Sequence, residues 1–140
     1  MPRFKCSRQG FNLIELMVVV AIVGVIAGIS SPSIFRYVNS NRLQTQADRL
    51  AADLQYTRSL SISTATILRF TSTPTGYQVT NPVNGDIIRD TNFDNGLGLG
   101  IAQTSDFFPW GMADPNVFNI TNATGTITVN LMPTGIVEVQ

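Results

Sequence analysis

The hydrophobic pattern of the first 60 residues predicts one long helix whose two halves differ in polarity. Residues 16–29 are apolar or glycine without a break, and the run extends back past one carboxylate, Glu15. Between residues 43 and 61, apolar and small side chains recur at alternating spacings of four and three, which places them on one helical face: Leu43, Ala47, Leu50, Leu54, Thr57 and Ser61. We therefore expect a helix over about residues 11–63, apolar all round at first and amphipathic afterwards.

Pro32 is the only proline within this helical pattern. A proline inside a helix removes one backbone hydrogen bond and clashes with the preceding turn, so it bends or locally unwinds the helix. A helix that simply ends after residue 29 is the alternative. The pattern resumes after Pro32, however, and neither glycine nor proline occurs between residues 33 and 73. We expect a helix kink at Pro32.

After residue 63 the composition changes to threonine, asparagine, glycine and β-branched residues, which favour strands and turns. The pattern predicts a hairpin over 65–72 and 76–81, a short strand over 86–90, and a second hairpin over 125–131 and 136–139. Residues 91–116 read as a loop-rich connection with weak strands. The predicted fold class is α+β, with the long N-terminal α-helix packed on a C-terminal antiparallel β-sheet domain.

The distribution of charge bears on the apolar run. Nine basic and nine acidic residues balance, yet Arg3, Lys5 and Arg8 precede the run and Glu15 is the only charge within it. A bilayer core needs about 20 mostly apolar residues, and flanking positive charges stay on the cytoplasmic side. A secretory signal peptide cleaved near residue 31 and a plain single-pass anchor both fit this pattern. Neither gives the buried carboxylate of Glu15 a role, although such a group is costly in apolar surroundings.

Cleavage between Gly10 and Phe11 would explain the carboxylate. The new amine on Phe11 would lie about one helical turn from Glu15, on the same chain or on a neighbouring copy. Burying an amine and a carboxylate as a pair is far less costly than burying either charge alone. Glu15 would then set the register of helices that pack side by side.

The segment "GFNLIELMVVVAIVGVIAGISSP" resembles the class III signal sequence of type IV pilins and type II secretion pseudopilins. The resemblance implies a leader that ends at Gly10, cleavage by prepilin peptidase, and N-methylation of Phe11. It also makes Glu15 the fifth mature residue and Pro32 the twenty-second, both as in that family. Asn12 is the one departure, because the family usually has threonine there.

The segment "ADRLAADLQYTRSLSISTATILRF" and the hairpin "GTITVNLMPTGIVEV" are similar to GspH/FimT-like minor pseudopilins. This resemblance implies a minor structural subunit of a type II secretion pseudopilus or a type IV pilus, at the tip or in initiation. Its implied partners are other pilins in the filament, prepilin peptidase, the inner membrane and the assembly platform proteins. The body would lie in the periplasm before assembly. A DNA-uptake or adhesion pilin whose body binds a ligand is the alternative.

The implied organisation has four parts: a leader (1–10), a transmembrane and filament-core helix (11–31), its amphipathic continuation (32–63) and a β-rich body (64–140). Histidine is absent and Cys6 is the only cysteine, which removes the commonest general base, the commonest metal ligand and an intrachain disulfide. We expect no enzyme activity, no catalytic residues, no metal and no cofactor.

Three features of the body bear on whether it binds a ligand, and each is more typical of a body without one. Asp90, Asn92 and Asp94 alternate as in the start of a calcium loop, but the glycine comes one place late and the twelfth position is not glutamate, which favours a polar turn. No lysine or arginine follows Arg89, which argues against binding nucleic acid. An exposed partner patch and a small core under a loop are the two interpretations of Phe107, Phe108 and Trp110, and the core is favoured.

Overall fold

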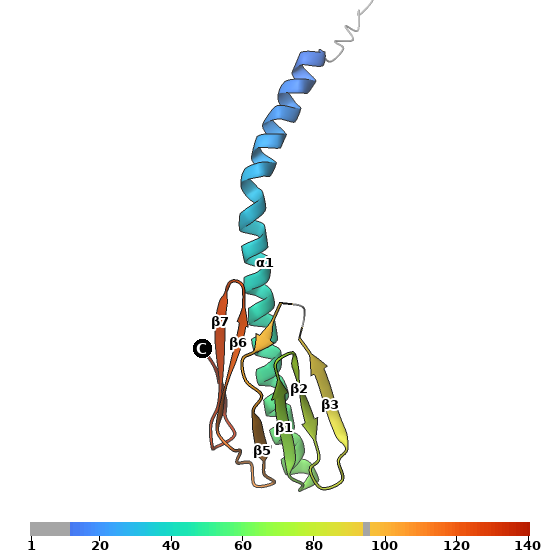
Figure 1. Cartoon of the computed structure of the whole chain (residues 1–140), viewed down its shortest axis with the longest axis vertical. Helices are drawn as coiled ribbons and strands as arrows, with labels where there is room; N and C mark the ends of the chain where they lie inside the picture. Colours follow the sequence, from blue (N-terminus) through green and yellow to red (C-terminus); the bar gives the residue numbers. More distant parts are fainter. Residues whose placement is uncertain (1–11, 94–95) are drawn as a thin grey trace, which may run out of the picture. The chain divides into compact units, whose positions relative to one another are not determined.

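One helix followed by eight strands makes up the part of the chain that the structure, a computed structural model, describes: residues 12–93 and 96–140 (Figure 1). The helix is α1 (Leu13–Thr64). The strands are β1 (Leu68–Thr73), β2 (Gly76–Thr80), β3 (Ile87–Asn92), β4 (Gly98–Leu99), β5 (Thr104–Phe107), β6 (Asn116–Asn122), β7 (Gly125–Leu131) and β8 (Val137–Val139). The chain divides into two units, residues 1–35 and 36–140, and the second is called the body below.

The single long helix predicted from the sequence is confirmed. Its C-terminal end is closed by Ala65, whose φ of 51° is in the left-handed region. The amide of Thr66 donates to the carbonyl of Ser61 at 3.2 Å and that of Ala65 to Ile62 at 3.4 Å, the paired bonds of a Schellman motif. Pro32 lies within the helix, and the kink expected there stays a prediction.

The strands form two antiparallel four-stranded sheets, in the orders β3-β2-β1-β5 and β4-β6-β7-β8. Both predicted hairpins are confirmed, as β1–β2 and β7–β8. The expected polar turn at residues 90–92 is wrong, because these residues continue strand β3 against β2. The sequence analysis also missed β6, although the alternation of Phe118 and Ile120 with polar residues is the signal of a half-buried strand.

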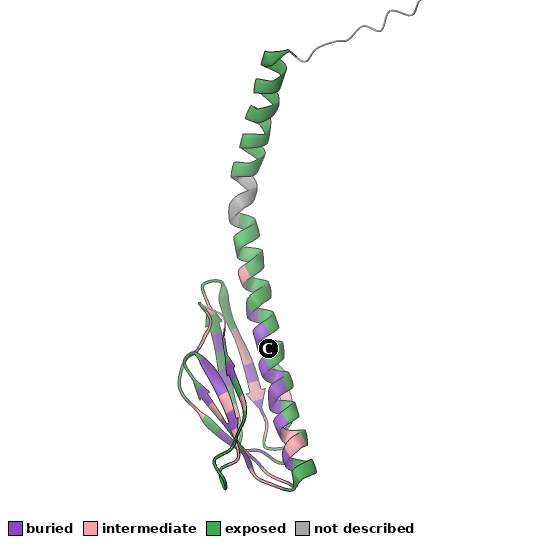
Figure 2. Ribbon diagram, turned by 90° about the vertical axis from the view of Figure 1, so that its right-hand side faces the viewer, coloured by how far each residue is buried: buried purple, intermediate pink, exposed green. Residues whose placement is uncertain are grey.

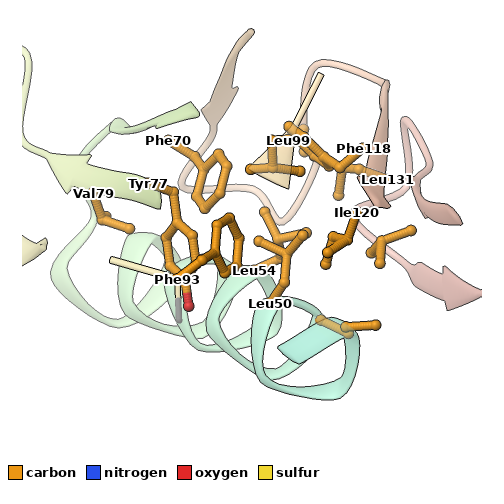
Figure 3. Packing of buried hydrophobic residues seen from close by; sticks show 14 of the residues in the cluster. Leu50, Leu54, Phe70, Tyr77, Val79, Phe93, Leu99, Phe118, Ile120 and Leu131 are labelled. Carbon is orange, nitrogen blue, oxygen red and sulfur yellow. The ribbon is translucent and has the colours of Figure 1, made fainter. Parts of the chain in front are cut away.

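The core of the body lies between one face of α1 and both sheets (Figures 2 and 3). All six residues of the predicted helical stripe are buried, and all except Leu43 are 0% exposed. Phe70 of β1 stacks on Tyr77 of β2 with ring centroids 5.1 Å apart, and meets Phe118 of β6 edge-on at 5.2 Å. Phe70 therefore joins the two sheets above the helix.

Every buried hydrophobic residue found within the described ranges belongs to residues 43–131, inside the body. The body therefore contains a core of its own, and it is suited to study as a separate fragment of residues 36–140.

Replacing Leu54 with alanine should lower the free energy of unfolding of the body by about 2–5 kcal/mol, because the side chain is fully buried and its loss leaves a cavity. Val83 is 83% exposed, so Val83→Ala should change stability by less than about 0.5 kcal/mol. Denaturant unfolding of the 36–140 fragment measures both. Equal effects of the two substitutions would contradict the packing described here.

Candidate functional site

The first turn of α1 is organised by Asn12. Its carbonyl accepts hydrogen bonds from the amides of Glu15 at 2.9 Å and Leu16 at 3.3 Å, and its side-chain oxygen lies 3.5 Å from the amide of Ile14. Asparagine is among the residues that best cap the start of a helix, because its side chain can satisfy an amide that has no partner within the helix. Asn12, which stands where threonine was expected, thus supplies the hydrogen-bond acceptors at the start of the helix.

Large apolar side chains cover this first part of α1 on all sides and stay uncovered within the described chain. From Leu13 to Ile26 their exposed fractions run from 52% to 76%. By length and composition, α1 is able to cross a bilayer. An apolar surface of this extent is unfavourable in water.

Glu15 is the one charged residue of α1 before Arg36. It is exposed, it lies in the first helical turn, and no ion pair holds it within the described ranges. Its place in the first turn is favourable, because the N-terminal end of a helix carries a partial positive charge. Gly10 and Phe11, expected to be the cleavage and methylation residues, lie outside the described residues, so their roles stay predictions.

The calcium-like segment does not form a calcium loop where it is described. Asp90 and Asn92 belong to β3, and Asp90 accepts a hydrogen bond from the Gln78 amide at 3.0 Å. Asp94 lies outside the described residues. No cluster of three or more acidic, cysteine or histidine side chains suited to a metal occurs in residues 12–93 and 96–140.

The aromatic segment is only partly core. Phe107 is fully buried, as expected, but Trp110 is 68% exposed, so the expected burial of Trp110 is wrong. Its ring stacks on Phe108 with centroids 4.9 Å apart and planes 9° apart. Trp110 lies in a turn closed by a 2.9 Å hydrogen bond from the Gly111 amide to the Phe108 carbonyl, and Gly111 has a φ of 85°.

A buried polar network joins the helix to the first sheet, and sequence reasoning did not find it. The carboxylate of Asp53, 5% exposed, accepts a 2.5 Å hydrogen bond from the Tyr77 hydroxyl and forms an ion pair with Arg89. The Arg89 guanidinium also lies 5.6 Å from the centre of the Tyr56 ring. Arg69 pairs with Asp106 at 2.7 Å. Because the last two arginines of the chain are both in ion pairs, neither is available as part of a phosphate-binding cluster.

Burial raises the pKa of Tyr77 above its ordinary value, and the hydrogen bond to Asp53 and its negative charge raise it further. The neutral hydroxyl is therefore the form that the folded body stabilises. In that form Tyr77 donates to Asp53, and it fixes strand β2 to α1.

Comparison with known proteins gives three findings. Residues 5–31 match the model of the prokaryotic N-terminal methylation motif. A 46-residue segment is 39% identical to the type IV major alpha-pilin and to fimbrial protein Q, both of Moraxella bovis, and covers 33% of this chain. The match spans 29% of the length of each of these relatives.

The third finding concerns the fold. Two crystal structures of the type IV minor pilin FimU from Pseudomonas aeruginosa superpose with TM-scores of 0.62 and 0.59, at 18% sequence identity. The superpositions cover 74% and 70% of this chain and 92% of each FimU chain. At this identity the likeness shows a shared fold, which confirms the predicted α+β class.

The methylation motif and the local identity to pilins each cover a minor part of the chain, and the likeness to FimU concerns the fold. Residues 5–31 carry a prokaryotic N-terminal methylation motif, and the chain is similar to type IV pilins over one third of its length.

The stability of the body should fall as the pH rises above about 10, the ordinary pKa of tyrosine. In that range the unfolded chain loses the Tyr77 proton while the folded body keeps it, so ionisation favours unfolding. Denaturant unfolding of the 36–140 fragment as a function of pH measures this dependence. Tyr77→Phe is the control and should show a shallower decline. An equal slope for both proteins would contradict the assigned role of the Tyr77 proton.

Proposed function

We propose that the chain is a minor pilin or pseudopilin, a structural subunit of a type IV pilus or a type II secretion pseudopilus. The observation that carries the proposal is the uncovered apolar first part of α1, with Glu15 as its one charge and the methylation motif around it. Such a helix suits the inner membrane before assembly and the centre of a filament afterwards, because both environments cover apolar side chains.

In this proposal prepilin peptidase removes residues 1–10 by cutting between Gly10 and Phe11, and Phe11 is then N-methylated. The basic leader stays in the cytoplasm, which directs the body into the periplasm. Residues 11–31 hold the subunit in the inner membrane until the assembly platform proteins insert it into the filament. A kink at Pro32 would let the apolar and amphipathic parts of the helix follow different directions.

The energetic role of Glu15 follows from the cost of burying its charge. Inside a helix bundle an unpaired carboxylate is strongly unfavourable, whereas a carboxylate paired with an amine is tolerated. The amine of Phe11, on the same subunit or on a neighbour, is the proposed partner. Only one relative position of two helices would bring these groups together, so the pair would set the register of each incoming subunit.

The place of the subunit in the filament is proposed from its body. The body shares the fold of a minor pilin, which supports a minor component at the tip or in initiation over a bulk subunit. The solvent-facing surface of the body, including the stacked Phe108 and Trp110, would then contact other subunits of the tip.

The processing step is tested by intact mass and N-terminal analysis of the protein purified from its native membrane. We expect a mature chain that begins with N-methylated Phe11. Replacing Gly10 with a bulky residue should leave the leader attached, with the protein still in the membrane. A mature start near residue 31, or an uncut Met1, would overturn the proposed pathway.

The assembly role is tested by replacing Glu15 with glutamine, which removes the charge at nearly constant shape. Membrane insertion should be unchanged, because the apolar run is intact, while the amount recovered in sheared filaments should fall by about tenfold or more, as expected when a buried charge loses its partner. Glu15→Asp should retain part of the incorporation. Asp48→Asn, which removes an exposed carboxylate of the body, should incorporate normally. Normal incorporation of Glu15→Gln would exclude the pairing.

A further inference from the structure

Strand β8 forms one edge of the second sheet, because β7 is its only neighbour in the order β4-β6-β7-β8. Thr128 and Gln140 exchange two hydrogen bonds, at 2.9 and 2.8 Å, and the amide of Met132 donates to the carbonyl of Ile136 at 2.8 Å. In an antiparallel ladder the residues that bond to the neighbouring strand alternate with residues whose amide and carbonyl face away. Val137 and Val139 are therefore the residues whose backbone groups face away from β7.

The outward edge of β8 lines a groove. A cavity of about 430 Å³ lies between the start of β8 and the face of α1 that carries Gln55, Ser59 and Ile62. Val137 lines it on the strand side, beside Ile136, which is 50% exposed. Ile62 is 48% exposed on the helix side. The groove thus combines unpaired backbone donors and acceptors with apolar side chains.

Arg58 brings a fixed positive charge to the same groove. Its Nε donates to the carbonyl of Gly111 at 2.9 Å, and the two terminal nitrogens have no hydrogen-bond partner within the described ranges. Gly135, with a φ of 73°, makes room for the guanidinium. A methyl group at Gly135 would lie 2.5 Å from the Arg58 Nε and 2.6 Å from the Gly111 carbonyl oxygen. The turns at Gly111 and Gly135 therefore fix the position of the Arg58 guanidinium. Its two terminal nitrogens remain available to a ligand in the groove.

The other sheet edges are less suited to an added strand. Beside β5 the amide of Asp114 donates to the carbonyl of Asp106 at 2.9 Å, so a following loop covers that edge. Strand β4 has only two residues, and the amide of one of them, Leu99, already donates to the carbonyl of Pro74 at 3.2 Å. The pairing of β3 with β2 contains a register shift between Val79 and Thr80, so β3 is an irregular edge.

We propose that the groove between β8 and α1 binds an extended segment of another protein that adds to β8 as a strand and carries a carboxylate for Arg58. Unpaired backbone groups on a sheet edge select an extended backbone, and alternate side chains of the added strand then enter the adjoining groove. The guanidinium selects a carboxylate, with which it can form two parallel hydrogen bonds. The half-exposed Ile62 and Ile136 select an apolar side chain beside it.

The strand itself limits what can bind. Strand β8 has three residues, and it carries Glu138, whose charge disfavours pairing with a second acidic edge of the same kind. Backbone pairing alone is therefore weak, and the partner must also satisfy Arg58 and the apolar side chains. In a filament the donor would be a neighbouring subunit, and this last step rests on the proposed function, whereas the binding chemistry of the groove does not.

The test uses the ¹⁵N-labelled 36–140 fragment and a short blocked peptide that alternates threonine and valine around one central glutamate. Titration followed by NMR should shift the amide of Val137 and the side-chain Nε–H of Arg58, and should protect the Val137 amide from hydrogen exchange. The same peptide with lysine in place of glutamate should bind about tenfold more weakly or worse, since like charges then meet in the groove.

Two variants separate the backbone contribution from the charge. Val137→Pro removes the outward amide and keeps the groups that pair with β7, so peptide binding should be lost while the Gln140 amide stays protected. Arg58→Gln should abolish the difference between the glutamate and lysine peptides. Arg69→Gln is the matched control: it removes an arginine that is already paired with Asp106, and it should leave binding unchanged.

Several outcomes would overturn the proposal. They are the absence of any shift at Val137 with millimolar peptide, equal binding of the glutamate and lysine peptides, and unchanged binding by Val137→Pro. Shifts at Val137 that grow with protein concentration, without peptide, would instead show that a second copy occupies the edge. None of these results depends on filament assembly, so the proposal can fail while the proposed function stands.

Discussion

Burial of one face of α1 against two separate sheets is the interaction on which the body depends. Neither sheet covers the other completely, and both place aromatic or β-branched residues on the same helical stripe. Leu50 and Leu54 lie at its centre, with no exposed surface. Because the sheets share this one support, a defect in the stripe would loosen both of them together. The buried carboxylate of Asp53 adds polar bonds to the first sheet at the border of the apolar contact.

The two halves of α1 differ in how their apolar side chains are shielded from water. Its second half is satisfied within the chain by the sheets, whereas the apolar side chains from Leu13 onward have no cover inside the described chain. This difference follows from the sequence: the first half of the helix is an unbroken apolar run, whereas the second half has one apolar stripe and polar residues on its other faces. The two halves of one continuous helix therefore differ in how much of their apolar surface the described chain covers.

Local patterns in the sequence predicted the elements that depend on neighbours along the chain. The helix, its buried stripe and both hairpins follow from short-range periodicity and turn residues. The polar network did not, because Asp53 lies off the stripe and meets Tyr77 and Arg89 from strands 24 and 36 residues away. Trp110 was also predicted wrongly, because hydrophobicity alone does not decide whether a side chain in a turn is buried, and this one is 68% exposed. The pairing of β6 with β4, which joins residues 98–99 to residues 120–121, also depends on contacts that no local pattern records.

The attachment of the sheets to α1 has a mechanical consequence. The hairpin between β6 and β7 is tied to the helix at Asn122, whose side-chain amide donates to the carbonyl of Asn39 at 2.8 Å. At the other end of the body Arg58 holds the turns at Gly111 and Gly135. Tension along α1 would therefore load the helix–sheet interface in shear, with the apolar contacts sharing the force at once. Because these contacts are loaded together, no single one of them has to break first, as it would if a strand were peeled from one end.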